Sequence, residues 1–439
     1  DTGATLASQS PDPHDRTDAM KTTLIRNASI WDGTGAHAFA GDLLIEGNRI
    51  LSSLPGGAGA GVRADVEIDG TGKFLMPGMT EGHAHLSFDG VTCTENLITP
   101  PPEEHTLLTA RVAKTLLDHG FTSAYGASAA KLRLDVAVRN EINAGRLPGP
   151  RVRAGSLEIT VTGALGDESR LHNPRNGPSI VVDGAEEMRK AVRLCCREGC
   201  DNIKLDVSGD PFYPDTPAHA TLMSLEEIRM AVQTAHSFGK KVNVHARSIA
   251  SIRHSLVAGV DVIYHAEYTD EETLDMLEAA KDRIFVAPTI SLFHTMLHDA
   301  ADFGMPRAAA EAMGIPGLIE ESVKTHTELR KRGIRHLIGG DYGFAWSMQG
   351  TNARDLRFFM DYYGYSAADA LVCATRNGGL AMREEGDLGT LCPGMLADML
   401  LVDGNPLEDV TILTDKRRLA MVMKDGEICS IWPALQAAG

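Results

Sequence analysis

Short apolar segments that end in a polar, metal-binding type of side chain recur along the chain and alternate with helical patterns. Segments 242–245 and 260–265 each end in a histidine, and segment 336–341 ends in an aspartate. Segments 224–233 and 249–258, which lie between them, carry apolar residues at helical spacing. Alternating strands and helices predict a parallel sheet, and polar residues at the carboxyl ends of several strands are typical of a (β/α)8 TIM barrel. We therefore predict an α/β fold of this kind.

The run 75–85 is apolar and ends in His83 and His85, one residue apart. Residues two apart on a strand point to the same side, so both imidazoles can face one metal ion. Neutral imidazole is the commonest protein ligand for zinc-like metals. A single histidine at the end of an apolar strand, such as His245, is more often a hydrogen-bonded core residue. It is the complete set that indicates a metal site.

Lys204 lies inside the apolar segment 201–207. A lysine in a barrel core is costly unless its charge is removed or paired. Two explanations stay open at this point. The amine is either chemically neutralised or paired with Asp206 or Asp341.

The ordered set of two histidines, a lysine, two further histidines and an aspartate resembles the metal-dependent amidohydrolase superfamily, over residues 24–432. Within it the chain is similar to the imidazolonepropionase-like branch, which holds dipeptidases, ochratoxin-type amidases, and phenylurea and molinate hydrolases. Segments 144–151 and 158–167 are most similar to the phenylurea and molinate hydrolases. The resemblance implies six metal ligands at the ends of the first, fourth, fifth, sixth and eighth barrel strands: His83, His85, Lys204, His245, His265 and Asp341.

The resemblance also implies a binuclear centre. Carbon dioxide would convert Lys204 to a carbamate that bridges two divalent ions, Zn²⁺ first of all, with Co²⁺ or Mn²⁺ as alternatives. A metal-bridging hydroxide would attack the substrate, and Asp341 would pass its proton to the leaving nitrogen. The expected reaction is hydrolysis of a C–N bond in a small amide, urea or carbamate.

Loops that follow barrel strands set substrate choice, and they supply four candidate substrate-binding residues. Asp210 follows the lysine strand and would repel a substrate carboxylate, so it favours neutral amides, phenylureas and carbamates over dipeptides. The other three candidates are His172, His294 and Asn352.

Three alternative functions differ in the site that they require. An Xaa-Arg or Xaa-Pro dipeptidase, or an N-acyl amino acid hydrolase of the ochratoxin-type amidase kind, would use the same six ligands. A deaminase is disfavoured because those family members usually keep one metal and lack the strand-four lysine. A non-catalytic scaffold is disfavoured because none of the six ligands is missing.

The formal net charge of −17 argues against nucleic acid or an anionic membrane surface as a partner. A small-molecule substrate is the expected partner, and the resemblance implies a homo-oligomer. The seven cysteines are an odd number scattered along the chain, which favours reduced thiols and a cytoplasmic location.

The two ends of the chain are predicted to form a second unit. Segments 24–31, 42–50, 397–402 and 420–428 have the composition of strands. We expect a β-sandwich built from residues 20–75 and 386–439, which flanks a hydrolase barrel of residues 76–385. Residues 1–19 are polar and patternless, so we expect a disordered leader or tag, with Met20 as the natural start.

Overall fold

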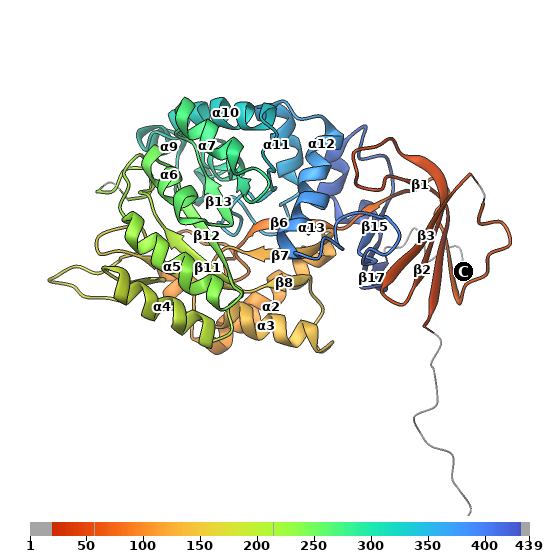
Figure 1. The fold of residues 1–439 in the computed structure, drawn as a ribbon, viewed down its shortest axis with the longest axis horizontal. Coiled ribbons are helices and arrows are strands. Elements are labelled where there is room, and N and C mark those ends of the chain that lie inside the picture. The colour runs from red at the N-terminus through yellow and green to blue at the C-terminus, as the bar shows by residue number, and fades with distance from the viewer. Residues whose placement is uncertain (1–19, 57, 214, 432–439) are drawn as a thin grey trace, which may run out of the picture.

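The computed structural model describes residues 20–56, 58–213 and 215–431. An α/β body of parallel strands and surrounding helices lies beside a sheet that both ends of the chain build (Figure 1). The leader expected at residues 1–19 falls outside the described residues.

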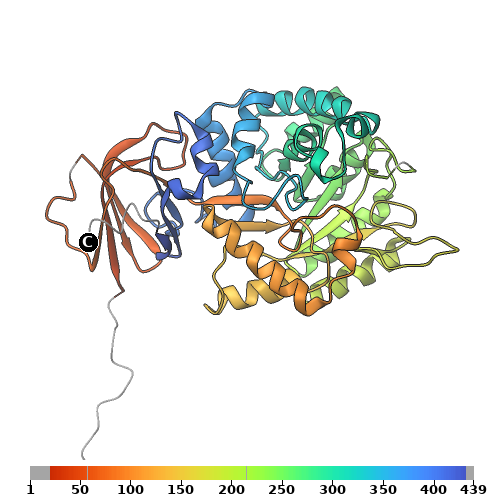
Figure 2. The same cartoon turned by 180° about the vertical axis from the view of Figure 1, so that it is seen from behind.

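The sheet beside the body joins strands from the two ends of the chain. Near its middle, β5 pairs in parallel with β1 from the amino-terminal part and antiparallel with β15 from the carboxyl-terminal part. The view from behind shows the red amino-terminal strands and the blue carboxyl-terminal strands next to each other (Figure 2). All eight strands belong to one hydrogen-bonded sheet, and its division into the two layers of a sandwich stays a prediction. The strands are β1 (Thr22–Ile30), β2 (Phe39–Glu46), β3 (Arg49–Pro55), β4 (Val66–Asp69), β5 (Phe74–Pro77), β15 (Met399–Val402), β16 (Leu419–Lys424) and β17 (Glu427–Ile431).

The strands of the body form two parallel sheets. One has the order β10-β9-β11-β12-β13-β14 and the other the order β6-β7-β8. Along β11 and β12, polar side chains such as Lys204 and His245 alternate with apolar ones such as Val244, and helices cover the outer face of the sheets (Figure 1). The strands are β6 (Met79–Ala84), β7 (Phe121–Gly126), β8 (Arg151–Arg153), β9 (Gly155–Thr160), β10 (Ser179–Val181), β11 (Asn202–Asp206), β12 (Lys241–Ala246), β13 (Val262–His265) and β14 (Phe285–Ala287).

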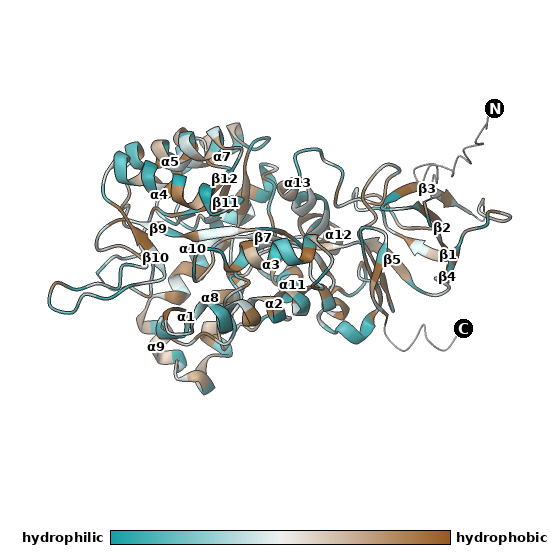
Figure 3. Ribbon diagram, turned by 90° about the horizontal axis from the view of Figure 1, so that it is seen from below, coloured by the Kyte–Doolittle hydropathy of each residue, from teal (hydrophilic) through white to brown (hydrophobic). Residues whose placement is uncertain are grey.

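The helices around the strands carry both hydrophilic and hydrophobic residues (Figure 3). At the start of α5, Ser224 and Glu227 form a reciprocal capping box. None of the described helices is both long and apolar enough to cross a lipid bilayer. The helices are α1 (Glu95–Ile98), α2 (Pro102–Asp118), α3 (Leu134–Asn143), α4 (Ala185–Arg197), α5 (Leu225–Ser237), α6 (Ile249–Ala258), α7 (Glu271–Ala279), α8 (Ile290–His298), α9 (Arg307–Ala312), α10 (Ile315–Lys331), α11 (Arg354–Tyr363), α12 (Ala367–Val372) and α13 (Gly378–Met382).

The segment predicted as the eighth barrel strand, 336–341, is not a regular strand. A single bridge joins His336 to Val286 of β14, and one hydrogen bond of 2.9 Å runs from the Gly82 amide of β6 to the carbonyl of Ile338. The strands are therefore arranged as in a barrel, but their ladders do not close into a continuous ring. The segment still brings Asp341 beside the end of β6.

Gly339 permits this close approach between the eighth segment and β6. A Cβ atom at Gly339 would lie 2.6 Å from the backbone nitrogen of His83. We expect Gly339→Ala to lower the free energy of unfolding by about 1–3 kcal/mol, the usual cost of overpacking. Thermal unfolding should show a lower melting temperature.

Gly317 provides the matched control for this substitution. It lies in α10, and a Cβ added there has no neighbour within 4 Å. Gly317→Ala should leave the melting temperature unchanged or raise it, because alanine is the better helix former. An unchanged melting temperature in Gly339→Ala would show that the contact with His83 does not limit packing.

Candidate metal centre

The six residues predicted as metal ligands line one cavity of about 470 Å³. They come from β6, β11, β12 and β13 and from the segment 336–341, and the cavity lies toward the carboxyl ends of the strands, where a barrel enzyme carries its catalytic groups. The four histidines and the lysine are at most 3% exposed. The fold therefore brings together all six residues that the sequence pattern singles out.

His83, His85 and Asp341 form the tightest group. Their candidate ligand atoms all lie within 4.8 Å of one another, and the Nε2 atom of His85 is 3.1 Å from an Asp341 oxygen. Both ring nitrogens of His83 are buried and have no hydrogen-bond partner. An unpartnered buried imidazole is unfavourable, so a metal ion at this position would supply the missing partner.

Each of the other three histidines has a hydrogen-bond partner outside the ligand group on one ring nitrogen. The His85 Nδ1 atom is 3.1 Å from the Ser128 carbonyl oxygen, and the His265 Nδ1 atom is 2.7 Å from the Thr289 hydroxyl. The His245 Nε2 atom is 3.1 Å from the Gly209 carbonyl oxygen. Metal-binding histidines commonly use one nitrogen in this way, which fixes the ring and its tautomer.

The rings of His245 and His265 lie side by side, with centroids 4.2 Å apart. The rings of His265 and His83 are 5.6 Å apart, so the second histidine pair adjoins the first group. Burial lowers the pKa of His83, His245 and His265 well below 6.5. Neutral imidazole is the form that binds a metal ion.

Asp341 is the charged member of the cluster. Its burial acts to raise the pKa, but the nearby rings of His83 and His85 outweigh that effect and hold the pKa of Asp341 below 3.8. The cluster thus offers neutral nitrogens and a charged oxygen, a donor set that suits zinc, cobalt and manganese.

Lys204 is 2% exposed, and its Nζ atom lies 4.9 Å from the centroid of the Tyr264 ring. No ion pair joins it to Asp206 or Asp341, or to another carboxylate of the described residues. The explanation of Lys204 as an ordinary paired lysine therefore lacks its partner. The residues present fit a carbamate, which would replace the buried cation with an anion beside the histidines.

Aromatic side chains form one wall of the cavity. The rings of Phe212 and Phe344 stack at 6.1 Å, and those of Phe344 and Trp346 at 5.4 Å. Phe88 stacks on the ligand candidate His85 at 4.4 Å. We call these four residues the aromatic wall. Phe88 meets Phe344 edge to face at 6.4 Å, so the wall places a continuous aromatic surface beside the ligand cluster.

Comparison with protein-family models matches residues 74–429 to the Amidohydrolase family. The chain belongs to the amidohydrolase family. Ochratoxinase from Aspergillus niger is 28% identical over 379 residues, which cover 81% of this chain and 75% of the relative. The relationship confirms a hydrolase that acts on C–N bonds.

Solved structures share the fold of this amidohydrolase. A Xaa-Pro dipeptidase with bound methionine in its active site has a TM-score of 0.82 at 25% identity, covering 93% of this chain and 99% of that one. Molinate hydrolase has a TM-score of 0.74 at 20% identity, and the match covers 93% of this chain and 95% of that one. Phenylurea hydrolase B has a TM-score of 0.71 at 19% identity, covering 95% and 98%.

Two further carboxyl groups lie near Lys204 in this amidohydrolase: one that the sequence reasoning missed, Glu158, and one that it considered only as an ion-pair partner of the lysine, Asp206. Glu158 of β9 is the register neighbour of Lys204 on β11, and it lines the cavity. Asp206 is buried without a hydrogen-bond partner for either oxygen; its burial and the nearby Glu158 raise its pKa. The alternation of inward positions along the two strands would have found both residues.

Asp210 lines the cavity as predicted, and a buried arginine lies beside it. Arg247, 1% exposed, lies 3.0 Å from an Asp210 oxygen and 2.5 Å from a Glu267 oxygen. One guanidinium thus faces two carboxyl groups, so it weakens but does not cancel the predicted repulsion of a substrate carboxylate, and the preference for neutral substrates stays a prediction. Sequence alone could not place the arginine, because its partners are 20 and 37 residues away in the chain.

The three other candidate substrate residues do not line the cavity. His172 is exposed in the loop between β9 and β10. His294 is 2.7 Å from the hydroxyl of Tyr362, and the buried Asn352 donates to Glu81. Their positions after predicted strands were no guide to where the side chains point.

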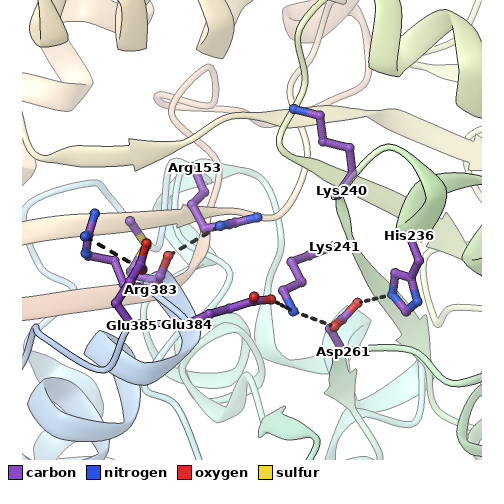
Figure 4. A pocket seen from close by; sticks show the side chains of 10 residues that line it. Arg153, His236, Lys240, Lys241, Asp261, Arg383, Glu384 and Glu385 are labelled. Carbon is purple, nitrogen blue, oxygen red and sulfur yellow. Dashed lines mark hydrogen bonds and ion pairs between the residues drawn. The ribbon is translucent and has the colours of Figure 1, made fainter.

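A second hollow, of about 540 Å³, lies at the opposite, amino-terminal end of the barrel strands (Figure 4). Its charged groups bind one another: Asp261 is 2.9 Å from His236 and 3.2 Å from Lys241. It contains none of the ligand candidates, so the chemistry belongs to the other end of the barrel.

Proposed function

We propose that this amidohydrolase is a binuclear metal-dependent hydrolase that cleaves the C–N bond of a small amide, urea or carbamate carrying an aromatic group. The observation that carries the proposal is the aromatic wall beside the six ligand candidates. An aryl group stacked there would hold the scissile carbonyl at the metal cluster, since aromatic contacts impose both apolar burial and orientation.

The roles of the chain's own residues follow from their positions. His83, His85 and Asp341 would hold one ion, and His245 and His265 the other, with carbamylated Lys204 between them. Such ions lower the pKa of bound water and polarise a carbonyl group. Asp341 would accept the proton of the attacking water and deliver it to the leaving nitrogen.

A second candidate function is hydrolysis of an N-acyl amino acid or a dipeptide. The ion pair between Arg247 and Asp210 supports it, because the guanidinium offsets part of the negative charge that a substrate carboxylate would meet. Among the described residues that line the cavity, Arg170 is the one cationic side chain besides Lys204. Its nearest hydrogen-bond partner is the carbonyl oxygen of Ser169, 3.3 Å away, so its guanidinium could bind a carboxylate at the mouth.

A substrate panel tests both candidates. The enzyme, reconstituted with Zn²⁺, Co²⁺ or Mn²⁺, would be assayed on phenylureas, anilides, aryl carbamates, N-acyl amino acids and dipeptides, each with aryl and alkyl members. We expect the aryl member of a series to have the higher kcat/KM. Equal rates for aryl and alkyl members would contradict the proposal.

Phe344 is the centre of the aromatic wall, and its removal gives a specific prediction. We expect Phe344→Ala to raise KM for an aryl substrate by about tenfold, which corresponds to the loss of about 1.4 kcal/mol of aromatic contact. Steady-state kinetics on the best panel substrate would measure it. Phe303→Ala removes a 45% exposed phenylalanine outside the cavity, and it should leave KM unchanged.

We further propose that the chain works on a small molecule as a cytoplasmic homo-oligomer, without nucleic acid or a membrane as partner. The net charge of −17 supports the exclusion of polyanionic partners. Gel filtration with light scattering would test self-association.

A further inference from the structure

Three buried residues behind the cavity form a continuous hydrogen-bonded chain that ends on a metal-ligand candidate. The Tyr365 hydroxyl is 2.7 Å from the His336 Nδ1 atom. The His336 Nε2 atom is 3.1 Å from the His326 Nδ1 atom. The His326 Nε2 atom is 2.7 Å from the backbone carbonyl oxygen of His265.

The acceptor at the end of the chain fixes the direction of every bond. A carbonyl oxygen only accepts, so His326 must carry its proton on Nε2. His326 and His336 are both 0% exposed, and no carboxylate of the described residues bonds to either ring, so both are neutral. The His326 Nδ1 atom is then an acceptor, which requires a proton on the His336 Nε2 atom. By the same reasoning the Tyr365 hydroxyl donates to the His336 Nδ1 atom.

The residue that receives this chain has an unusual backbone. His265 has a φ of 77°, and Ala266 follows with a φ of 57°. Left-handed conformations are unfavourable for residues other than glycine, and they persist only where surrounding contacts hold them. The turn directs the His265 carbonyl to α10, where His326 lies.

We propose that Tyr365, His336 and His326 are positioning residues that hold the backbone turn at His265 and thereby set the affinity of the second metal position. The inference rests on the proposed function because it takes His265 as a ligand. We call the hydrogen-bonded chain of Tyr365, His336 and His326 the relay. The Thr289 hydroxyl orients the His265 ring, and the relay holds the His265 backbone. Partners of this kind typically contribute about 10- to 100-fold to metal affinity.

Metal titration of matched variants tests the proposal. His326→Leu removes the donor to His265 and should lower the affinity for the second ion by at least tenfold. The ion held by His83, His85 and Asp341 should stay bound. His326→Gln can place a donor near the position of Nε2 and should recover part of the affinity. Equal affinity of wild type and His326→Leu for both ions would overturn the proposal.

Two tyrosine variants provide a milder comparison, should His326→Leu fail to fold. Tyr365→Phe removes the first donor of the relay and should also lower the affinity for the second ion. Tyr363→Phe removes a buried hydroxyl of α11 that is 2.8 Å from the hydroxyl of Ser322. Ser322 lies on α10, the helix that carries His326, but neither it nor Tyr363 belongs to the relay. This variant should leave the affinity for both ions unchanged. The same weakening in both variants would assign the effect to general loss of packing.

The bond directions can be measured without metal or activity. In protein with nitrogen-15 labelled histidine, we expect protons on Nε2 of His326 and His336, and a coupling through the hydrogen bond between His336 Nε2 and His326 Nδ1. A proton on Nδ1 of either ring would refute the relay. If wild type bound no metal but showed these tautomers, the proposed function would fail while the relay stood.

Discussion

Replacing Lys204 with alanine is expected to remove at least one of two bound ions and to lower turnover by about 1000-fold or more. Metal ions contribute several kcal/mol to transition-state stabilisation, and each 1.36 kcal/mol corresponds to a factor of ten in rate. In the proposed centre, carbamylated Lys204 would contribute to both ion positions. Elemental analysis and steady-state kinetics on the same preparation would measure both effects.

Further Lys204 variants separate loss of the carbamate from loss of the side chain. Small carboxylates added to Lys204→Ala should restore part of the metal and activity, because they supply the missing bridging oxygens. Lys204→Arg keeps the positive charge but cannot form the same carbamate, so it should remain inactive. A fully metallated and active Lys204→Ala protein would refute the carbamate bridge.

Asp341→Asn is expected to lower turnover by a factor on the order of 100 or more, the usual contribution of a general base. Asparagine keeps the shape and one ligating oxygen but removes the group that accepts the proton. Metal content should therefore fall less than kcat does. Kinetics normalised to bound metal would separate the two effects.

Asp361→Asn serves as the control, since this aspartate bonds to Arg357 at the surface, away from the cavity. Its kcat should match that of the wild type. Near-normal turnover in metal-loaded Asp341→Asn would assign the proton transfer to another group, and Glu158 would be the next candidate because it lines the same cavity.

The ligand cluster could be predicted from the sequence because each histidine and Asp341 ends a short apolar segment, and Lys204 lies within one. A strand directs alternate residues inward, and parallel strands bring their carboxyl ends together. These local rules place His83, His85, Lys204, His245 and His265 at one end of the body without any knowledge of tertiary contacts. Barrel-like architecture follows from the same alternation of strands and helices.

Features that depend on long-range packing could not be predicted in the same way. The pairing of Arg247 with Asp210 joins two loops that are far apart in the chain. The left-handed backbone at His265 has no sequence signal, since histidine there would be read as an ordinary strand residue.

The central claim is a two-metal centre, and the metal content of the wild-type protein tests it most directly. The protein would be stripped of metal, reconstituted with excess Zn²⁺, Co²⁺ or Mn²⁺ in the presence of bicarbonate, and dialysed before elemental analysis. The account predicts about two divalent ions per chain, as the two-metal mechanism requires. One ion or none with every metal, in a folded protein, would contradict it.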